Sequence, residues 1–260
     1  MTTLNSVPDL TFIMCAYNEI DRIQSALDDL YTSVEGRTET FEVIVIDNGS
    51  GDGTREWLEK VDLLNLSVVL NLDNLGKGGS IKKGIALSKG RHVVIHDPDM
   101  EYRAADVWRL LDAAREDRSP MVLGSRTLGG HDISYHYFAN YLGVRFLSAL
   151  VNGLYGSKLT DTATAMKLMD GDMARGLRLQ STGFDLDFEL VVRVLRLGHS
   201  ISECRVDYFP RTKAEGKKLR AWRDGLLALR AIVRDRLLPR SRFMADEVVA
   251  EVAVSHVEGP

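Results

Sequence analysis

Short apolar runs alternate with amphipathic stretches along the first half of the chain. Apolar runs that each end in a polar turn predict buried strands, and they cover residues 10–16, 41–46, 66–70, 92–96 and 120–124. Between these runs, apolar residues at helical spacing predict helices over residues 21–31, 53–62, 78–88 and 105–115. This alternation predicts a doubly wound α/β sheet, in which ligands bind at the carboxyl ends of the strands.

The pattern of the second half is less regular. Apolar spacing predicts helices over residues 134–155, 188–197 and 219–237, and strands over residues 161–169 and 201–207. No clear pattern follows the last of these helices. We therefore expect one α/β domain over residues 1–210, a basic amphipathic helical extension over residues 211–242 and a disordered tail over residues 243–260.

Composition narrows the class of protein without indicating its chemistry. The 260 residues carry a net charge of −4, so the molecule as a whole lacks the basic character suited to nucleic acid. Residues 1–8 lack the basic start and apolar core of a signal peptide, and no apolar run is long enough to predict a membrane span. Cys15 and Cys204 give neither a metal-ligand spacing nor a disulfide framework. We therefore expect a cytoplasmic protein.

Two polar motifs directly follow the first two predicted strands. The first, AYNE, begins at Ala16, and the second, DNGSGDGT, begins at Asp47 and includes Gly49. A carboxylate at a strand end can accept hydrogen bonds from a nucleobase or a ribose, and glycine lets the backbone approach a ligand closely. The second motif is equally well explained as a tight turn in which Asp52 caps the next helix.

A third motif, NLGKGG, begins a predicted helix. Glycines at a helix start present backbone N–H groups to an anion, and Lys77 beside Gly78 adds a positive charge. The spacing differs from that of a Walker loop. The alternative is a helix start with flexible glycines and no ligand.

The acidic motif HDPDME follows the predicted strand over residues 92–96. Asp97 and Asp99 are separated by one residue, and Glu101 follows two further on. Such carboxylates supply oxygen ligands to Mg²⁺ or Mn²⁺, and magnesium sites commonly combine one or two of them with substrate phosphates. A metal held in this way would neutralise the charge on a leaving nucleoside diphosphate. The alternative is an acidic surface turn that caps the next helix.

Taken in order, AYNE, DNGSGDGT, NLGKGG and DPDMEY resemble the family-two inverting glycosyltransferases with the GT-A fold. The similarity continues through GSR, DTATAMKLM, GFDLDFEL and YFPRTKAEGKKLRAWRDG, and it covers residues 10–230. The later blocks look like the polyprenyl-phosphate glycosyltransferases, the group that contains the dolichyl-phosphate mannose synthases. Pro98 departs from the alanine usual in the family, and residues 161–164 match the family's acceptor loop only loosely.

The resemblance implies roles for individual residues. Those expected around the nucleotide are Ala16, Tyr17, Glu19, Asp47, Gly49, Lys77, Gly78 and Asp97. The metal positions are Asp97 and Asp99, with Glu101 as third ligand or its neighbour. The residues expected to approach the acceptor or the phosphates are Arg126, Arg211, Lys217 and Lys218. Asp99, Arg126 and Arg211 are thus the expected catalytic residues, together with Asp187 where a base is needed.

The composition of residues 211–242 bears on whether the acceptor is a membrane lipid. This segment holds eleven Lys or Arg residues against three Asp or Glu. Its apolar residues at helical spacing are Leu219, Trp222, Leu226, Leu229, Val233 and Leu237. A basic amphipathic helix can lie on the inner face of an anionic membrane, or it can pack on the domain with a solvated basic face. The aromatic residues within 135–155 can likewise hold a lipid or fill a core.

The acceptor also decides whether a base is needed. A phosphate monoester, with a second pKa of about 6, is already largely ionised at neutral pH. A sugar hydroxyl needs a general base, and Asp187 or Asp185 is the candidate. We expect metal-dependent, inverting transfer of a hexose from a GDP- or UDP-sugar to a polyprenyl phosphate. The alternatives are a soluble hydroxyl acceptor, or an inactive sugar-nucleotide-binding or membrane scaffold protein.

Overall fold

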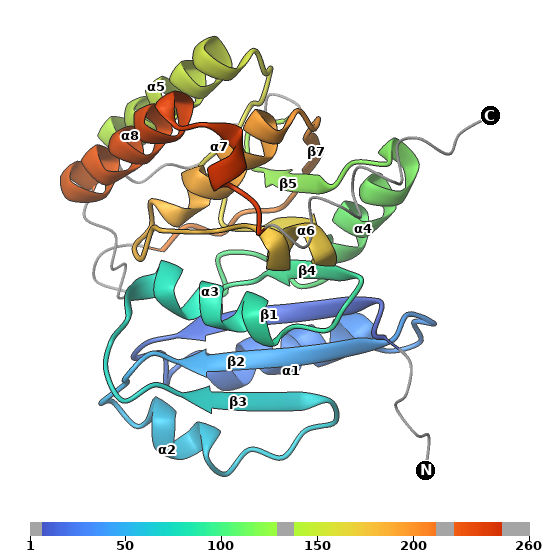
Figure 1. Cartoon of the computed structure of the whole chain (residues 1–260). Helices are drawn as coiled ribbons and strands as arrows, with labels where there is room; N and C mark the ends of the chain where they lie inside the picture. Colours follow the sequence, from blue (N-terminus) through green and yellow to red (C-terminus); the bar gives the residue numbers. More distant parts are fainter. Residues whose placement is uncertain (1–6, 129–137, 212–220, 246–260) are drawn as a thin grey trace.

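Seven β-strands form one sheet with helices on both faces in the computed structural model (Figure 1), which describes residues 7–128, 138–211 and 221–245. The sheet has the order β3-β2-β1-β4-β6-β5-β7. Its strands are β1 (Leu10–Ala16), β2 (Phe41–Asp47), β3 (Leu66–Leu70), β4 (His92–Ile95), β5 (Met121–Ser125), β6 (Lys167–Asp170) and β7 (Ser202–Arg205). The first five lie where the sequence predicts them. β7 lies inside its predicted segment, whereas β6 begins inside its own and extends one residue beyond it.

The sheet is parallel except at β6. β1 pairs in parallel with β2 and β4, β2 with β3, and β5 with β7, whereas β6 runs antiparallel to both β4 and β5. The parallel strands β1 to β4 therefore end at one edge, and the polar loops that follow them meet there. This arrangement confirms the mostly parallel, doubly wound sheet expected from the sequence.

Alternating residues of the strands build two separate cores. Phe12 and Met14 of β1 pack under α1 (Ile23–Val34) and α4 (Asp106–Asp117), while Ile13 packs on the opposite face. That face is covered by α3 (Gly76–Leu87), α6 (Gly171–Gly176) and α7 (Leu186–Leu197). Strands buried on both faces in this way need near-continuous apolar runs, which is the pattern seen in the sequence.

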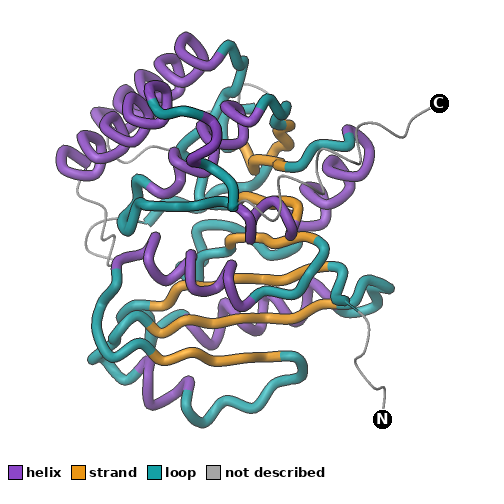
Figure 2. Tube along the Cα trace, viewed as in Figure 1, coloured by secondary structure: helices purple, strands orange, loops and turns teal. Residues whose placement is uncertain are grey.

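Two further helices lie against α7. These are α5 (Phe138–Tyr155) and α8 (Ala221–Leu237), which run side by side at one end of the molecule (Figures 1 and 2). Arg193 of α7 is fully buried between Glu189 and Asp235, and its Nε donates to Asp235 of α8 at 2.7 Å. This buried ion pair holds α8 against α7.

The sequence prediction fails at a few boundaries. The short α2 (Thr54–Leu58) ends well before residue 62, and α6 is absent from the prediction. The short 3₁₀ helix η1 (Arg240–Arg242) leads to Phe243 and Met244, which are buried, and the N–H of Arg178 donates to the carbonyl of Phe243. The expected tail therefore begins by packing on the domain. Of the helices in the described part of the chain, none is long and apolar enough to cross a membrane.

Candidate active site

The loops after β2 and β3 are joined by one buried asparagine. The Asn48 side-chain oxygen accepts from the backbone N–H of Leu75 at 2.8 Å, and its amide donates to Asn74. Asp47 beside it is fully buried, and its carboxylate accepts from the backbone N–H groups of Gly49 and Ser50. Asp47 thus stabilises its own turn, and it shapes the loop that Asn48 ties to the start of α3.

The loop after β1 brings a buried carboxylate to the same edge. Ala16 is buried at the end of the strand, and Tyr17 after it is half-buried. The backbone N–H of Glu19 donates to the Thr54 hydroxyl at 2.9 Å, which fixes this loop to the start of α2. Asn18 has a φ of 51°, an uncommon backbone conformation for a residue other than glycine. The expected base and ribose residues therefore lie in or beside the neighbouring loops that follow β1 and β2.

The glycines of NLGKGG let the start of α3 lie against the loop before α7. A Cβ on Gly76 would stand 2.2 Å from the carbonyl oxygen of Thr182, and a Cβ on Gly78 would stand 2.8 Å from that of Gly183. Gly76 also has a φ of +76°, which favours glycine. These contacts hold the first turn of α3 in place, with Lys77 facing the end of β4.

Each aspartate of the acidic motif is paired with a cation. Lys77 Nζ lies 2.6 Å from Asp97, and Arg211 Nη2 lies 2.6 Å from Asp99. Arg211 also approaches Glu19 at 3.4 Å. The arginine therefore links the loop after β1 to the loop after β4.

Glu101 has a different environment from the two aspartates. Its carboxylate accepts from the Tyr208 hydroxyl and from the backbone N–H of Arg211, both at 2.9 Å. Met100 before it has a φ of 62°, an uncommon backbone conformation for a residue other than glycine. Within the described ranges, no group of three or more His, Cys, Asp or Glu residues is arranged to hold a metal ion. Through its two hydrogen bonds, Glu101 anchors the segment that carries Arg211.

Asp97 and Asp99 nevertheless fit a divalent cation that is shared with a diphosphate. Burial, followed by the neighbouring carboxylates of Asp97 and Glu101, raises the pKa of Asp99 to about 6, although Arg211 opposes this. The part of this change that comes from Asp97 and Glu101 reflects repulsion between like charges, which a divalent cation would relieve. Two carboxylates completed by substrate phosphates form a common magnesium site.

A chain of alternating charges extends inward from Asp97. Asp187 at the start of α7 accepts from Lys167 at 2.8 Å and lies 3.8 Å from Lys77, which in turn contacts Asp97. Lys167 is fully buried, and burial lowers its pKa against the opposing charge of Asp187. Burial also acts to lower the pKa of Lys77, but the carboxylates of Asp97 and Asp187 outweigh it and raise that pKa.

Arg126 at the end of β5 is held by a fully buried carboxylate. Its Nε and Nη2 donate to the two oxygens of Asp161 at 2.6 and 2.8 Å, and its guanidinium stacks on the Tyr208 ring at 5.0 Å. Tyr208 in turn donates to Glu101. The arginine expected to face the acceptor is therefore already charge-compensated, and it supports the segment that leads to Arg211.

The structure brings most of the predicted residues together and adds several others. The ion pairs form two groups of three charges, one of Lys77, Asp97 and Asp187 and the other of Arg211, Glu19 and Asp99. The charge of Asp97 acts on Asp99, so the two groups lie next to each other. Lys217 and Lys218 lie outside the described residues. The partners that sequence reasoning missed are Asn48, Asp161, Lys167 and Tyr208, and the only signal for Lys167 was a charge inside an otherwise apolar strand segment.

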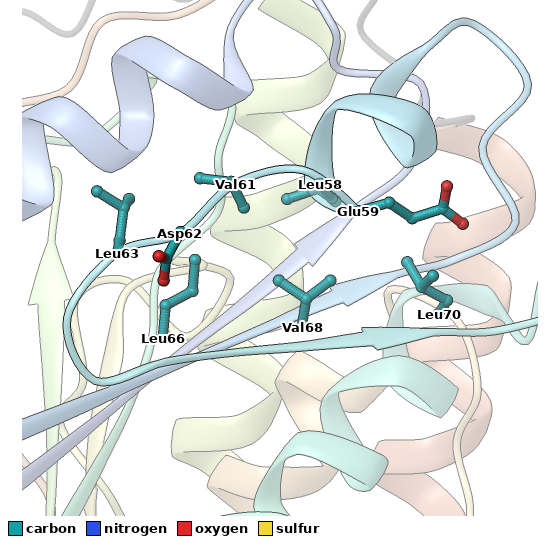
Figure 3. A pocket seen from close by; sticks show the side chains of 8 residues that line it. All are labelled: Leu58, Glu59, Val61, Asp62, Leu63, Leu66, Val68 and Leu70. Carbon is teal, nitrogen blue, oxygen red and sulfur yellow. The ribbon is translucent and has the colours of Figure 1, made fainter.

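A cavity of about 350 Å³ lies apart from these two groups, between the end of α2 and the edge strand β3 (Figure 3). Its lining is Leu58, Glu59, Val61, Asp62, Leu63, Leu66, Val68 and Leu70. None of the predicted site residues belongs to it. The strand-end charges therefore remain the candidate active site.

The fold and the site together define a class of protein, the GT-A glycosyltransferases. The chain is similar to the glucosyl-3-phosphoglycerate synthase of Mycobacterium tuberculosis solved with Mn²⁺, UDP-glucose and phosphoglyceric acid, with a TM-score of 0.67 and 19% identity over 89% of this chain and 81% of that one. Residues 11–168 match the model of Glycosyl transferase family 2, and the chain belongs to this family. The match confirms the family inferred from the motifs and makes the chain a glycosyltransferase.

Two curated relatives extend the comparison beyond the matched segment. A dolichyl-phosphate β-glucosyltransferase of Dictyostelium discoideum is 27% identical over 243 residues, which cover 87% of this chain and 73% of the relative. An undecaprenyl-phosphate mannosyltransferase of Micrococcus luteus is 27% identical over 218 residues, which cover 79% of this chain and 85% of the relative. Both names describe transfer to a polyprenyl phosphate.

Proposed function

We propose that this protein transfers a hexose, with inversion, from a nucleoside diphosphate sugar to a polyprenyl phosphate at a membrane surface. The observation that carries the proposal is the environment of Asp187, the residue in line to act as a base. Its carboxylate lies between the ammonium groups of Lys167 and Lys77, and the alternative, Asp185, accepts from the backbone N–H of Gly183. A phosphate acceptor is already an anion and needs no base.

The reaction follows from the charges at the strand ends. An oxygen of the acceptor phosphate bonds to the anomeric carbon as the bond from that carbon to the diphosphate oxygen breaks, and the nucleoside diphosphate leaves with the electron pair. Asp97 and Asp99 would hold a divalent cation, which would supply positive charge to the leaving group. Lys77 and Arg211 lie beside these carboxylates and supply the remaining compensation. The names of the two relatives support the acceptor.

The donor and the acceptor are tested together by turnover. We expect release of UDP or GDP with Mn²⁺ from one member of a panel of UDP- and GDP-sugars, only when a short-chain polyprenyl phosphate is present. Asp99→Asn should lower this turnover by roughly a hundredfold or more. The matched control is Asp117→Asn, at an exposed aspartate at the end of α4, which should leave turnover unchanged. Turnover with a soluble saccharide in the absence of the lipid phosphate would contradict the proposal and show that the acceptor is a hydroxyl group.

A further inference from the structure

The outward face of α8 carries an apolar stripe that the domain does not cover. Trp222, Leu226, Val233 and Leu237 are 82%, 50%, 41% and 79% exposed. At 3.6 residues per turn these four lie within about 60° of arc around the helix. The residues that α8 buries against the domain are Ala228, Ala231, Ile232 and Asp235, roughly on the opposite side. Four large apolar side chains of this helix are therefore turned to solvent, whereas Ile232 is buried.

The neighbouring α5 repeats this arrangement. Leu142 and Phe146, one turn apart, are 51% and 62% exposed, whereas Leu147 and Val151 are buried. The Tyr155 hydroxyl donates to the Ile232 carbonyl at 2.6 Å, which ties α5 to α8. Because both helices rest on α7, the residues that they turn away from α7 form the outer surface of this end of the molecule. Exposed apolar patches of this kind mark interaction sites.

The charges around the stripe have one sign. The exposed charged residues of the two helices are Arg145, Arg223, Arg230 and Arg236, and no acidic residue is exposed on the described part of either helix. This surface is basic in a chain whose net charge is −4. Arginines that flank an apolar stripe complement a partner with an anionic surface above an apolar interior, which is the profile of a bilayer containing anionic lipids.

We propose that the outer faces of α5 and α8 dock the protein on an anionic lipid bilayer. The inference rests on the proposed function, because this docking surface would bring the protein to the membrane that contains the polyprenyl phosphate. Figure 1 shows α5 and α8 on the side toward which the arrowheads of β1, β2 and β3 point, the side of the candidate active site. The stripe that inserts is separate from the charged residues assigned to the reaction.

Vesicle binding tests this surface without any donor or acceptor. The full chain should float with vesicles of phosphatidylcholine and phosphatidylglycerol, and less with phosphatidylcholine alone. Replacing Leu226 and Val233 together by Asp should reduce the bound fraction at least about tenfold, and each of Arg223→Gln and Arg230→Gln should weaken binding roughly fivefold. The matched control is Leu64→Asp, at a 74% exposed leucine before β3, which should bind like the wild type. Equal binding by the double variant would overturn the proposal.

Trp222 provides a second measurement that a misfolded variant cannot imitate. Trp108 is 4% exposed and Trp57 is half-buried, so Trp222 is the tryptophan best placed to report contact with lipid. Its emission should shift to the blue on anionic vesicles, and Trp222→Phe should bind with little shift. An unshifted emission from bound wild-type protein would overturn the proposed orientation.

Turnover separates this proposal from the proposed function. The double variant should act like the wild type on a short-chain, water-soluble polyprenyl phosphate and lose activity on a long-chain acceptor in vesicles. Vesicle binding without any turnover of lipid phosphate would overturn the proposed function and leave the docking surface intact. A concentration-dependent dimer that is abolished by the double substitution, with no vesicle binding, would assign the stripe to a second copy of the chain and overturn the lipid proposal.

Discussion

Arg211 reaches Asp99 from 112 residues further along the chain, and its Nη2 lies 2.6 Å from the carboxylate. The guanidinium therefore neutralises the carboxylate that a divalent cation would use. Glu101 secures this arrangement by accepting from the Arg211 backbone N–H. Metal binding at Asp99 requires the arginine side chain to exchange partners, and the diphosphate of a donor is the natural new partner for it.

Replacing Arg211 by alanine should therefore change metal binding and turnover in opposite directions. Without the competing cation, Mn²⁺ should bind roughly tenfold more tightly in the absence of nucleotide. Turnover should fall by at least about tenfold, because the phosphates lose a cation. Free Mn²⁺ measured by electron paramagnetic resonance gives the first quantity. Arg91→Ala, at a 69% exposed side chain, is the control, and weaker Mn²⁺ binding by Arg211→Ala would contradict the exchange.

Gly76 and Gly36 form a matched pair for testing the loop before α3. Both have left-handed backbones, with φ of +76° and +72°, so alanine costs roughly 1 kcal/mol of conformational strain at each. Only at Gly76 would the new Cβ meet a backbone oxygen, that of Thr182 at 2.2 Å, since nothing lies within 4 Å at Gly36. Gly76→Ala should displace the start of α3 and weaken nucleotide binding roughly tenfold or more, whereas Gly36→Ala should lower only the unfolding free energy. Calorimetry with UDP and GDP distinguishes the two, and equal affinities would refute the role assigned to the loop.

The pH dependence of turnover shows whether Asp187 orients Lys77 or acts as a general base. If its carboxylate orients Lys77, Asp187→Asn should lower turnover roughly tenfold or more and leave the shape of the pH–rate profile unchanged. Lys167→Met should have a similar effect on turnover, because it removes the buried partner of Asp187. Turnover measured from acid to alkaline pH with a short-chain polyprenyl phosphate gives the profile. Loss of its acidic limb in Asp187→Asn alone would identify a base and favour a hydroxyl acceptor.

The sequence predicts the strand ends well, because parallel strands buried on both faces leave an unmistakable apolar pattern. Asp97 and Lys77 could be placed at the site from this pattern together with the family motifs. The environment of Glu101 could not, because it depends on Tyr208, which is 107 residues away and belongs to another loop. The burial of Asp235 was equally hidden, since a charged residue in an amphipathic helix ordinarily faces water.

The apolar patterns of two amphipathic helices also had opposite outcomes. The apolar spacing of α1 faces the core, where Ile23 and Leu27 are buried, while that of α8 faces solvent, where Trp222 is exposed. Periodicity shows that a helix has an apolar side, but not what covers it. The small residues Ala228 and Ala231 on the other side of α8 were the available signal that this side packs closely against another helix.

The buried pair of Asp161 and Arg126 should make stability depend on pH only under strongly acidic conditions. Burial alone would raise the pKa of Asp161, but the charge and hydrogen bonds of Arg126 outweigh it and hold this pKa below its ordinary value of 3.8. A depressed carboxyl pKa stabilises the fold above the ordinary pKa, and this contribution is lost as the pH falls through the lower, folded-state pKa. Asp161→Asn leaves the arginine buried without its carboxylate and should cost about 3 to 5 kcal/mol at neutral pH.

Denaturant unfolding across pH measures this contribution directly. The difference in unfolding free energy between the wild type and Asp161→Asn should stay constant from about pH 8 to about pH 5 and shrink only below about pH 4. Asp117→Asn, at an exposed residue, controls for the loss of one carboxylate and should follow the wild type throughout. A difference that already shrinks near neutral pH would mean that Asp161 titrates there, and that Arg126 does not hold its carboxylate ionised.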